Sequence, residues 1–547
     1  MIERPSGREL PVLDLPPAPP PRRPVVAGAI ADPRLAEFLP EELVLPRFFV
    51  WTLGCQMNRS DSEEMAGALI AAGCAPAPAL ECADLIVINT CAIREHAEAK
   101  VIGRQGQLAA LKAARPGTRV VLTGCAVRET DRARLARRYP AVDLFLRPDE
   151  EPELVARLGL AGAGTPGGAV RSAATTLVGG RAVSAADHLP ATRATAVAAG
   201  RVERHSAVSA WLPIVYGCDK SCTYCIVPLS RGPERSRPFD EIVDEARALA
   251  AAGYREVTLL GQNVNSYGHD LPAEERFGHV ISERTAGRRL DLRSRPDLAE
   301  LLRAIDGIRT ADGRPAIPRL RFITSHPWDL SDRLVTAMAE RPSVCEALHL
   351  PVQSGDDAVL RRMGRQYTIE HYLERLAWIR AAVPGIALST DVIVGFCGET
   401  EAQFEATLRL LEAVRFDTVF AAAYSPRPGT PAERLADDVP PAEKRRRLNV
   451  LLGRQEAIGH ELNRAWLGRR VEVLVDGPAP QRAHDHDEPQ EPRPAPAGEG
   501  SLALVGRSRH NKLVHLAGRP DLVGQLATVE IVHAGPFALR GRLIGAE

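Results

Sequence analysis

Three cysteines lie close together in the run Gly-Cys-Asp-Lys-Ser-Cys-Thr-Tyr-Cys, at Cys218, Cys222 and Cys225. Three thiolates can hold three irons of a [4Fe–4S] cluster and leave the fourth iron open. An open iron can chelate a small molecule, so three ligands favour chemistry where four would favour electron storage. Zinc is the main alternative, but structural zinc takes four N/S ligands, and no fourth Cys or His lies nearby in the sequence. The triplet therefore predicts an open iron–sulfur site.

Three further cysteines each follow an apolar run of strand length. Cys55 follows Phe-Phe-Val-Trp-Thr-Leu-Gly, Cys91 follows Leu-Ile-Val-Ile-Asn-Thr, and Cys125 follows Arg-Val-Val-Leu-Thr-Gly. Helical sequence comes next, for example at Arg94–Ala113. Because the carboxyl ends of parallel strands share one edge of a sheet, the three cysteines can converge on one metal centre. The alternative is that each is a small buried hydrophobic side chain. That reading applies to Cys74, Cys82 and Cys345.

The apolar pattern in the middle of the chain predicts a repeated βα architecture. The predicted strands are Pro213–Tyr216, Glu256–Leu260, Leu320–Thr324, Ala347–Val352, Leu388–Val394 and Thr418–Tyr424. Helical segments such as Glu241–Ala252 and Ile369–Ala382 separate them. Six βα units are too few for a closed eight-stranded barrel, so we expect an open, partial (β/α)6 barrel. In such folds the active site lies at the carboxyl ends of the strands, where the triplet is found.

The fold class expected for the whole chain is α/β with an added small β-barrel. The predicted parts are a disordered Pro-rich leader (1–45), a parallel α/β domain (46–158), a linker (159–205), the partial barrel (206–440), a helical connector (441–466) and a C-terminal β-barrel (467–547). Charged sequence at 270–297 and a loop at about 478–498 are read as insertions. Five strands are expected in the C-terminal part: Val471–Val475, Leu502–Val505, Lys512–His515, Ala527–Val532 and Ala538–Leu543.

Composition limits the possible partners and compartment. With 69 basic and 69 acidic residues the net charge is zero, so any affinity for nucleic acid must come from local patches. No apolar run reaches the roughly 18 residues that span a bilayer, and the N-terminal sequence has no apolar signal core. Ten cysteines without an export signal favour a reducing, cytoplasmic location. A monomer without membrane contact is expected.

Together these motifs resemble the radical S-adenosylmethionine (SAM) methylthiotransferases, from about Phe48 to the C-terminus. The matching stretches are Leu-Gly-Cys-Gln-Met-Asn at 53–58, Asn-Thr-Cys-Ala-Ile-Arg-Glu at 89–95, the triplet with Arg231-Gly232 and Glu234–Arg237, Gly-Gln-Asn-Val-Asn-Ser-Tyr-Gly at 261–268, Thr-Ser-His-Pro at 324–327, Leu-Pro-Val-Gln-Ser-Gly at 350–355 and Tyr-Ser-Pro-Arg-Pro-Gly-Thr at 424–430. The chain departs from the family pattern at Cys397, where proline is usual, and in Ala-Val-Arg-Glu after Cys125.

The resemblance implies two [4Fe–4S] clusters and SAM as cofactors. An auxiliary cluster would be held by Cys55, Cys91 and Cys125, and the SAM-binding cluster by Cys218, Cys222 and Cys225. The candidates for SAM contacts lie near predicted strand ends and are Gln262, Gln353, Ser389 and Asp391. Their alternative role is to cap strand ends or to bond within loops. The C-terminal segment resembles the TRAM module, in which the candidates for phosphate contacts are Arg507, Arg509 and Lys512. The alternative for that segment is an ordinary solvated hairpin.

The implied activity is methylthiolation at C2 of N(6)-dimethylallyladenosine next to the anticodon of tRNA. SAM would serve as both radical source and methyl donor, since no side-chain base can remove the unactivated C2 proton. The amino-acid sequence around the triplet and at Gly261–Gly268 favours the dimethylallyladenosine branch of the family over its sister enzymes. Those sisters act on threonylcarbamoyl-adenosine in tRNA or on an aspartate of a ribosomal protein. A non-catalytic iron–sulfur RNA-binding sensor is a further alternative. The implied partners are tRNA and a one-electron donor such as flavodoxin or ferredoxin.

Overall fold

The computed structural model describes residues 46–91, 95–128, 132–160, 177–178, 181–182, 202–277, 282–285, 288–291, 294–479 and 501–546. The predicted leader, nearly all of the loop at 478–498 and most of the predicted linker lie outside the described residues. Pro46–Glu547 forms one unit by its contacts, and within it the strands fall into separate sheets.

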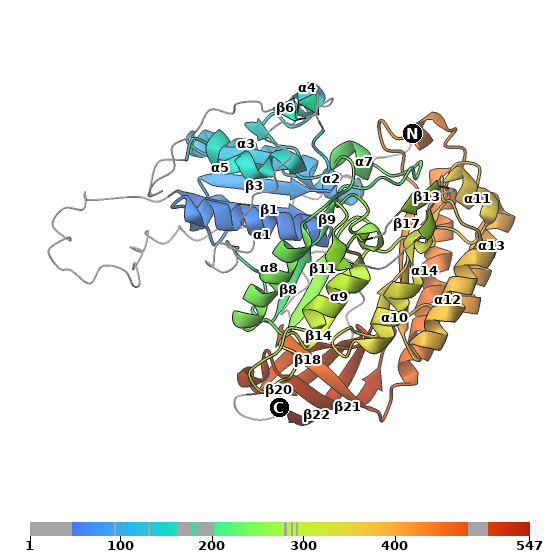
Figure 1. Ribbon diagram of the computed structural model, residues 1–547. Coiled ribbons are helices and arrows are strands. Elements are labelled where there is room, and N and C mark those ends of the chain that lie inside the picture. Colours follow the sequence, from blue (N-terminus) through green and yellow to red (C-terminus); the bar gives the residue numbers. More distant parts are fainter. Residues whose placement is uncertain are drawn as a thin grey trace, which may run out of the picture. The chain divides into compact units, whose positions relative to one another are not determined.

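Five parallel strands form the N-terminal sheet, in the order β2-β1-β3-β4-β5 (Figure 1). They are β1 (Arg47–Leu53), β2 (Ala75–Pro76), β3 (Leu85–Thr90), β4 (Arg119–Thr123) and β5 (Leu144–Phe145). The helices of this part are α1 (Gln56–Ala71), α2 (Glu95–Gly103), α3 (Gln105–Ala114), α4 (Arg132–Arg138) and α5 (Leu154–Arg157). Strand β3 is buried along its whole length, as its unbroken apolar run predicts for a sheet covered on both faces.

Two hydrophobic cores cover the two faces of this sheet. Leu69 of α1 packs with Val87 on one face, and Leu108 of α3 packs with Ile88 on the other. The single helix predicted at Arg94–Ala113 is two helices in the structure. They divide directly after Gly103, a residue with poor helix propensity.

Six parallel strands form the central part, in two sheets of order β8-β11-β14 and β15-β16-β17. They are β8 (Ser209–Pro213), β11 (Glu256–Leu260), β14 (Arg319–Ile323), β15 (Ala347–His349), β16 (Ala387–Val394) and β17 (Thr418–Ala423). A bridge between Leu320 and Val344 connects the two sheets. Among the described residues β8 and β17 do not pair, so the barrel is open, as the sequence predicted.

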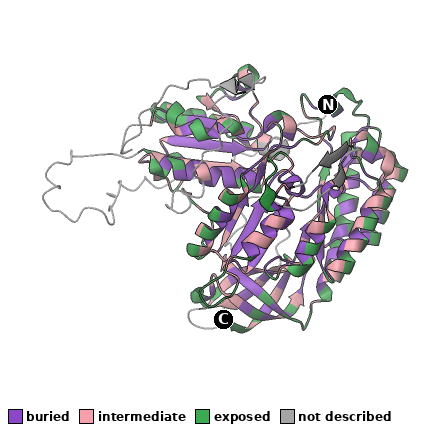
Figure 2. Cartoon of the chain, in the orientation of Figure 1, coloured by how far each residue is buried: buried purple, intermediate pink, exposed green. Residues whose placement is uncertain are grey.

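Helices cover the outer face of this partial barrel. They are α8 (Phe239–Ala251), α9 (Leu298–Asp306), α10 (Asp332–Glu340), α11 (Asp357–Arg362), α12 (Ile369–Ala382) and α13 (Glu401–Val414). Alternate residues of β16, including Leu388 and Val392, pack into the core beneath them. Since strand side chains alternate between faces, Ser389 and Asp391 lie on the inner face. Figure 2 shows this pattern, with purple strands inside helices whose outer surfaces are green.

The elements around the triplet are shorter than the sequence suggested. The predicted strand Pro213–Tyr216 is divided between β8 and β9 (Val215–Tyr216), and β9 pairs with β10 (Arg235–Ser236). A short helix, α7 (Val227–Ser230), follows the triplet. The remaining short strands are β6 (Leu177–Val178) and β7 (Arg181–Ala182) in the predicted linker, and β12 (Ser282–Thr285) and β13 (Arg288–Asp291) in the predicted insertion.

The C-terminal part is a long helix followed by a closed five-stranded barrel. Helix α14 (Pro441–Arg464) leads into the barrel, whose strand order is β18-β19-β20-β22-β21. Its strands are β18 (Arg470–Pro478), β19 (Leu502–Ser508), β20 (Leu513–Gly518), β21 (Leu526–Ala534) and β22 (Ala538–Ala546). Alternating apolar residues fill its core, as a period of two predicts for strands with one buried face.

Candidate metal centres and cofactor site

The three N-terminal cysteines lie at one edge of the sheet, as the sequence predicted. Neighbouring strands end in register, because Leu53 pairs with Thr90 and Asn89 pairs with Thr123. Cys55 and Cys125 come two residues after the ends of β1 and β4, and Cys91 comes directly after β3. Three adjacent strands therefore deliver one thiol each to the same edge.

A buried amide network, which sequence reasoning did not single out, supports this edge. The Asn58 side-chain amide donates to Asn89 Oδ1 at 2.8 Å, and the Asn89 amide donates to the Asn58 carbonyl oxygen at 2.7 Å. The Cys55 thiol donates to Asn58 Oδ1 at 3.3 Å. Gly124 has a φ of 91°, and a Cβ there would stand 2.3 Å from the Thr90 carbonyl oxygen. The turn into Cys125 therefore requires glycine.

The triplet occupies the loop between β9 and α7. Gly217, which precedes it, has a φ of 73°, and a Cβ there would stand 2.0 Å from the Pro233 carbonyl oxygen. The loop is fixed from α11, because Thr223 donates its backbone N–H to the Met363 oxygen and its hydroxyl to the Arg362 oxygen, both at 2.8 Å. The three thiols are thus presented by a rigid turn beyond the first barrel strand.

Each cysteine set accepts a bond from one buried arginine. Arg365 donates through Nη1 to Cys222 Sγ at 3.4 Å. Arg231, which belongs to the central part, donates through Nε to Cys125 Sγ at 3.1 Å and through Nη2 to Asp61 Oδ2 at 2.6 Å. Sequence reasoning noted Arg231 only as part of a motif. Its partner thiol lies 106 residues away in the chain, a distance that no local pattern bridges.

The donor sets fit iron–sulfur clusters better than a single ion. Among the described residues, no three His, Cys, Asp or Glu side chains gather tightly enough to hold one metal ion. In a four-iron cluster each cysteine binds a different iron, so the sulfurs need not meet at one point. Burial, together with the charges of neighbouring thiols, raises the pKa of Cys218 and of Cys225 to about 12. Iron must therefore displace protons from these thiols when it binds.

Loops from three strands meet beside the triplet in a polar network. Lys220 Nζ donates to Asp329 Oδ1 at 2.7 Å, and the Asn263 amide donates to the other oxygen of the same carboxylate at 2.6 Å. Close by, the Ser266 hydroxyl donates to Glu234 Oε2 at 2.5 Å. Burial, aided by neighbouring aspartates, raises the pKa of Glu234 to about 8. This carboxyl group is therefore largely protonated at neutral pH.

Two of the candidate SAM contacts follow strand ends as predicted. Gln262 comes two residues after β11, and its buried Oε1 accepts no hydrogen bond from the part of the chain that the structure describes. Gln353 has a φ of 73°, and its backbone bonds to Asp391 and Ile393 of β16 at 2.8 and 2.9 Å. Such a backbone is uncommon for a residue other than glycine and marks a constrained position at the barrel edge.

The other two candidates lie within β16: Ser389 is near its amino end, whereas Asp391 is in its middle and not near a strand end as predicted. Both contact His349, a residue that sequence reasoning missed: His349 Nδ1 is 3.0 Å from Ser389 Oγ, and Nε2 is 3.5 Å from Asp391 Oδ2. Phe420 packs edge-on against His349 at 5.7 Å between ring centroids and is 57% exposed. The inner face of the barrel thus carries a polar pair beside an exposed aromatic ring.

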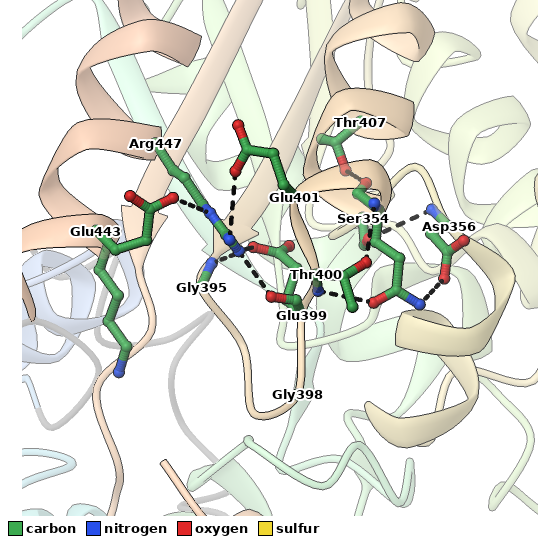
Figure 3. A network of polar contacts seen from close by, with 12 residues as sticks. Ser354, Asp356, Gly395, Gly398, Glu399, Thr400, Glu401, Thr407, Glu443 and Arg447 are labelled. Atoms are coloured by element: carbon green, nitrogen blue, oxygen red, sulfur yellow. Dashed lines mark hydrogen bonds and ion pairs between the residues drawn. The ribbon is translucent and has the colours of Figure 1, made fainter. Parts of the chain in front are cut away.

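The turn after β16 is held by the long C-terminal helix (Figure 3). Arg447 of α14 donates to Glu399 Oε2 and to Glu443 Oε1, both at 2.8 Å, and Gly395 N–H donates to Glu399 Oε2 at 2.6 Å. Within this turn Cys397 is buried and packs against Phe396 and other apolar side chains. Glu399 thus connects Arg447 of α14 to the start of the turn that contains Cys397.

The basic stretch of the C-terminal barrel faces the central barrel. Arg319 donates to the Arg507 oxygen at 2.6 Å, and Arg321 donates to the Ser508 and Arg509 oxygens at 2.8 and 2.9 Å. Both arginines belong to β14 and are buried. The hairpin between β19 and β20 is therefore docked at the amino ends of the barrel strands.

The candidate phosphate contacts differ in how free their charges are. Arg509 forms a bidentate ion pair with Glu346 at 2.8 and 2.9 Å. Lys512 is buried, and its Nζ lies 2.7 Å from Asp417 Oδ1. Among the described residues, the Arg507 guanidinium donates to Asn511 of its own hairpin, at 3.3 Å. The charges of Arg509 and Lys512 are thus already paired, whereas the Arg507 guanidinium forms no ion pair with the described part of the chain.

No helix in the described part of the chain is both long and apolar enough to cross a membrane.

Comparisons with known proteins agree with this geometry. Residues 212–411 match the Radical SAM superfamily, and residues 47–147 match the family described as uncharacterized protein family UPF0004. Proteins named tRNA-2-methylthio-N(6)-dimethylallyladenosine synthase from Roseiflexus sp. (strain RS-1) and Geobacillus kaustophilus (strain HTA426) are 41% and 39% identical to the chain. Each match covers 91% of this chain, with 89% and 82% of the relative.

A solved structure with partial likeness is the radical S-adenosylmethionine methyltransferase TsrM from Kitasatospora setae, with a TM-score of 0.47 and 16% identity over 80% of this chain and 78% of that one. The relatives at about 40% identity match over more than four fifths of their own length. The chain therefore belongs to the family of tRNA-2-methylthio-N(6)-dimethylallyladenosine synthases, which are radical SAM methylthiotransferases.

Proposed function

We propose that this chain adds a methylthio group to C2 of N(6)-dimethylallyladenosine next to the anticodon of tRNA. The observation that carries the proposal is the pair of three-cysteine sites, one at the edge of the N-terminal sheet and one at the mouth of the partial barrel, in a chain of this family. The cofactors are SAM and two [4Fe–4S] clusters, which supply the deoxyadenosyl radical and a site for sulfur when bound.

The protein's own residues bind the two clusters and orient SAM. We propose that Cys218, Cys222 and Cys225 hold the SAM-binding cluster, and that Cys55, Cys91 and Cys125 hold the auxiliary cluster. Gln262 and Gln353 stand at the barrel edge where SAM must lie to reach an open iron. The buried Oε1 of Gln262 accepts no hydrogen bond from the described residues. It can accept one from a ligand N–H, because an unsatisfied buried acceptor is costly.

The base is proposed to enter the partial barrel from its open side. A base in a single-stranded loop can be splayed out and stacked on an aromatic side chain. Phe420 offers such a ring on the inner face, and Asp391 beside it can accept a bond from the exocyclic N–H. Burial of the five prenyl carbons would contribute about 4 kcal/mol, at about 0.8 per CH2 group.

The C-terminal barrel is proposed to bind tRNA backbone phosphates. Of the three predicted contacts, Arg507 is the one that forms no ion pair with the described residues, so we assign the role to it first. The reaction also needs an external one-electron donor, such as a flavodoxin or ferredoxin. Because its substrate is tRNA, we propose that the protein acts in the cytoplasm, and as a monomer.

The direct test of substrate choice is anaerobic turnover on matched anticodon stem-loops with and without the dimethylallyl group. The prenylated stem-loop should react, and the unprenylated one should bind and react poorly because it lacks the apolar anchor. Equal rates on the two would remove the prenyl group from recognition. Activity only on a threonylcarbamoyl-adenosine stem-loop would favour a sister enzyme.

A further inference from the structure

One guanidinium connects the central barrel to the N-terminal cysteine site. Arg231 lies at the end of α7, and its side chain is 4% exposed. Its Nε donates to Cys125 Sγ at 3.1 Å while its Nη2 donates to Asp61 on α1. The Arg231 guanidinium therefore donates to two different partners, a thiol and a carboxylate, and both belong to the N-terminal part.

A charged donor at a sulfur ligand has a predictable electronic effect. A bond from a guanidinium to a thiolate is charge-assisted and stronger than a neutral bond. In a water-poor site the positive charge also acts over a short distance with little screening. Hydrogen bonds to ligand sulfurs and nearby charge are among the factors that set the reduction potential of an iron–sulfur cluster. A cationic donor favours the reduced cluster because that state carries the greater negative charge.

The second cysteine site offers an internal comparison. Arg365 donates to Cys222 Sγ at 3.4 Å, and its other groups bond to Tyr367 Oη and to the Pro351 oxygen, both at 2.9 Å. All of these partners belong to the central barrel itself. Arg231 differs because its contact depends on the docking of the barrel against the N-terminal sheet.

We propose that Arg231 is a positioning residue that raises the reduction potential of the auxiliary cluster through Cys125, so that this cluster reaches its working potential only when the two parts are docked. The inference rests on the proposed assignment of Cys55, Cys91 and Cys125 as cluster ligands.

The test compares two substitutions that break the same ion pair. Arg231→Gln removes the positive charge from Cys125, whereas Asp61→Asn removes the negative partner and leaves Arg231 free to donate to the sulfur. Both are made in the full-length chain with Cys218, Cys222 and Cys225 changed to Ala, so that only the auxiliary cluster is observed. The readouts are iron content and the midpoint potential from an EPR-monitored redox titration.

The expected shifts have opposite signs. Arg231→Gln should move the potential to a more negative value, Asp61→Asn should move it to a less negative value, and Arg231→Lys should lie between Arg231→Gln and the parent. A cluster lost only in Arg231→Gln would also support the role, since the ion pair is broken in Asp61→Asn as well. The matched control is Arg365→Gln, which should leave this potential unchanged.

A purely structural Arg231 would give a different pattern. Loosened docking alone would shift the midpoint potentials of Arg231→Gln and Asp61→Asn in the same direction, or would cause both variants to lose the cluster. Either result would overturn the inference. A midpoint potential that is unchanged in all variants would also overturn the inference, but it would leave the assignment of the cluster ligands intact. Absence of iron from the parent chain would instead contradict the assignment of Cys55, Cys91 and Cys125, and with it the proposed function.

Discussion

At the scale of single residues, the six cysteines divide between two sites that substitution can separate. Each cluster contributes about four irons, so the reconstituted protein should hold about eight. Cys222→Ala should leave about four irons and abolish SAM cleavage. Cys91→Ala should also leave about four irons, but SAM cleavage should persist while methylthiolation stops. Iron analysis and a 5′-deoxyadenosine assay measure the two effects.

The control for these variants is Cys345→Ala, a buried cysteine outside both sites, which should keep about eight irons. Loss of SAM cleavage in both cluster variants, with both still folded, would show that the two sites do not divide the chemistry as proposed.

Glu234 makes stability depend on pH in a defined window. Its pKa is raised from 4.5 to about 8, so between these values the unfolded state ionises while the buried group stays protonated. The stability that protonated Glu234 contributes is therefore fully present below about pH 4.5 and is lost as the pH rises towards 8. At 1.36 kcal/mol per pKa unit, the loss reaches roughly 4 kcal/mol. Glu234→Gln should remove most of this dependence in urea unfolding at pH 5 and pH 8.

The control for Glu234 is Glu405→Gln on the exposed face of α13, which should unfold like the parent at both pH values. If Glu234→Gln loses as much stability between pH 5 and pH 8 as the parent does, some other group carries the dependence.

Phe420 should contribute to substrate binding and not to SAM chemistry. Stacking of a base on an aromatic side chain is worth about 1–3 kcal/mol. Phe420→Ala should therefore raise KM for the stem-loop about tenfold, whereas Phe420→Tyr should keep most of the affinity. SAM cleavage without RNA should be unchanged in both variants. An unchanged KM in Phe420→Ala would place the base elsewhere.

Residue types and spacing were enough to predict that Cys55, Cys91 and Cys125 lie at one edge of the sheet, because strand ends in a parallel sheet share one edge. The sequence pattern was not enough to identify the residues that hold these cysteines in place. The contacts of Arg231 with Cys125 and of Asn58 with Asn89 join residues on different elements. His349 was missed because only the register of β15 with β16 places it beside Ser389.

At the scale of elements, β14 carries the docking of the C-terminal barrel. Arg321 pairs with Glu256 at 2.8 Å, and both side chains are 8% exposed. Arg321→Met would leave that carboxylate and two backbone oxygens without their donor, which should cost about 3–5 kcal/mol. Urea unfolding measures the loss, and limited proteolysis between α14 and β18 should become faster.

The control for Arg321 is Arg519→Met, because its ion pair with Asp521 is exposed on both sides. It should change stability by less than about 1 kcal/mol. An equally small effect in Arg321→Met would mean that the barrel is held by other contacts.

Elements with strong patterns were predicted closely, as for β11 and α12, which have the predicted bounds. Apolar runs flanked by polar turns sufficed there. The break between β8 and β9 was not predictable, because it depends on the antiparallel pairing of β9 with β10. The basic hairpin was assigned to RNA since its charge is visible in sequence, whereas its acidic partner Glu346 is 163 residues away.

At the scale of the whole molecule, the central barrel contacts both other parts through buried arginines. Arg231 reaches the N-terminal sheet, and Arg319 and Arg321 reach the C-terminal barrel. Removal of the C-terminal barrel would therefore leave Arg319 and Arg321 without their hydrogen-bond acceptors. It would also remove the proposed RNA contacts. A point change tests RNA binding more cleanly than truncation does.

Arg507→Ala should weaken binding to tRNA and reduce its salt dependence. One lost phosphate contact lowers the slope of log K against log salt by up to about 0.9. SAM cleavage without tRNA should be unaffected. The comparison variant is Arg519→Ala, whose guanidinium is already paired with Asp521. Identical salt slopes for Arg507→Ala and the parent would remove Arg507 from the RNA contact.

The central claim concerns the nucleoside that the protein makes, and mass spectrometry of tRNA nucleosides tests it most directly. Cells that lack the gene should accumulate N(6)-dimethylallyladenosine and lose its 2-methylthio derivative. The intact gene should restore the derivative, whereas the Cys91→Ala and Cys222→Ala forms should not. Persistence of the 2-methylthio derivative in the deletion strain, together with loss of a methylthiolated threonylcarbamoyl-adenosine, would contradict the proposed function.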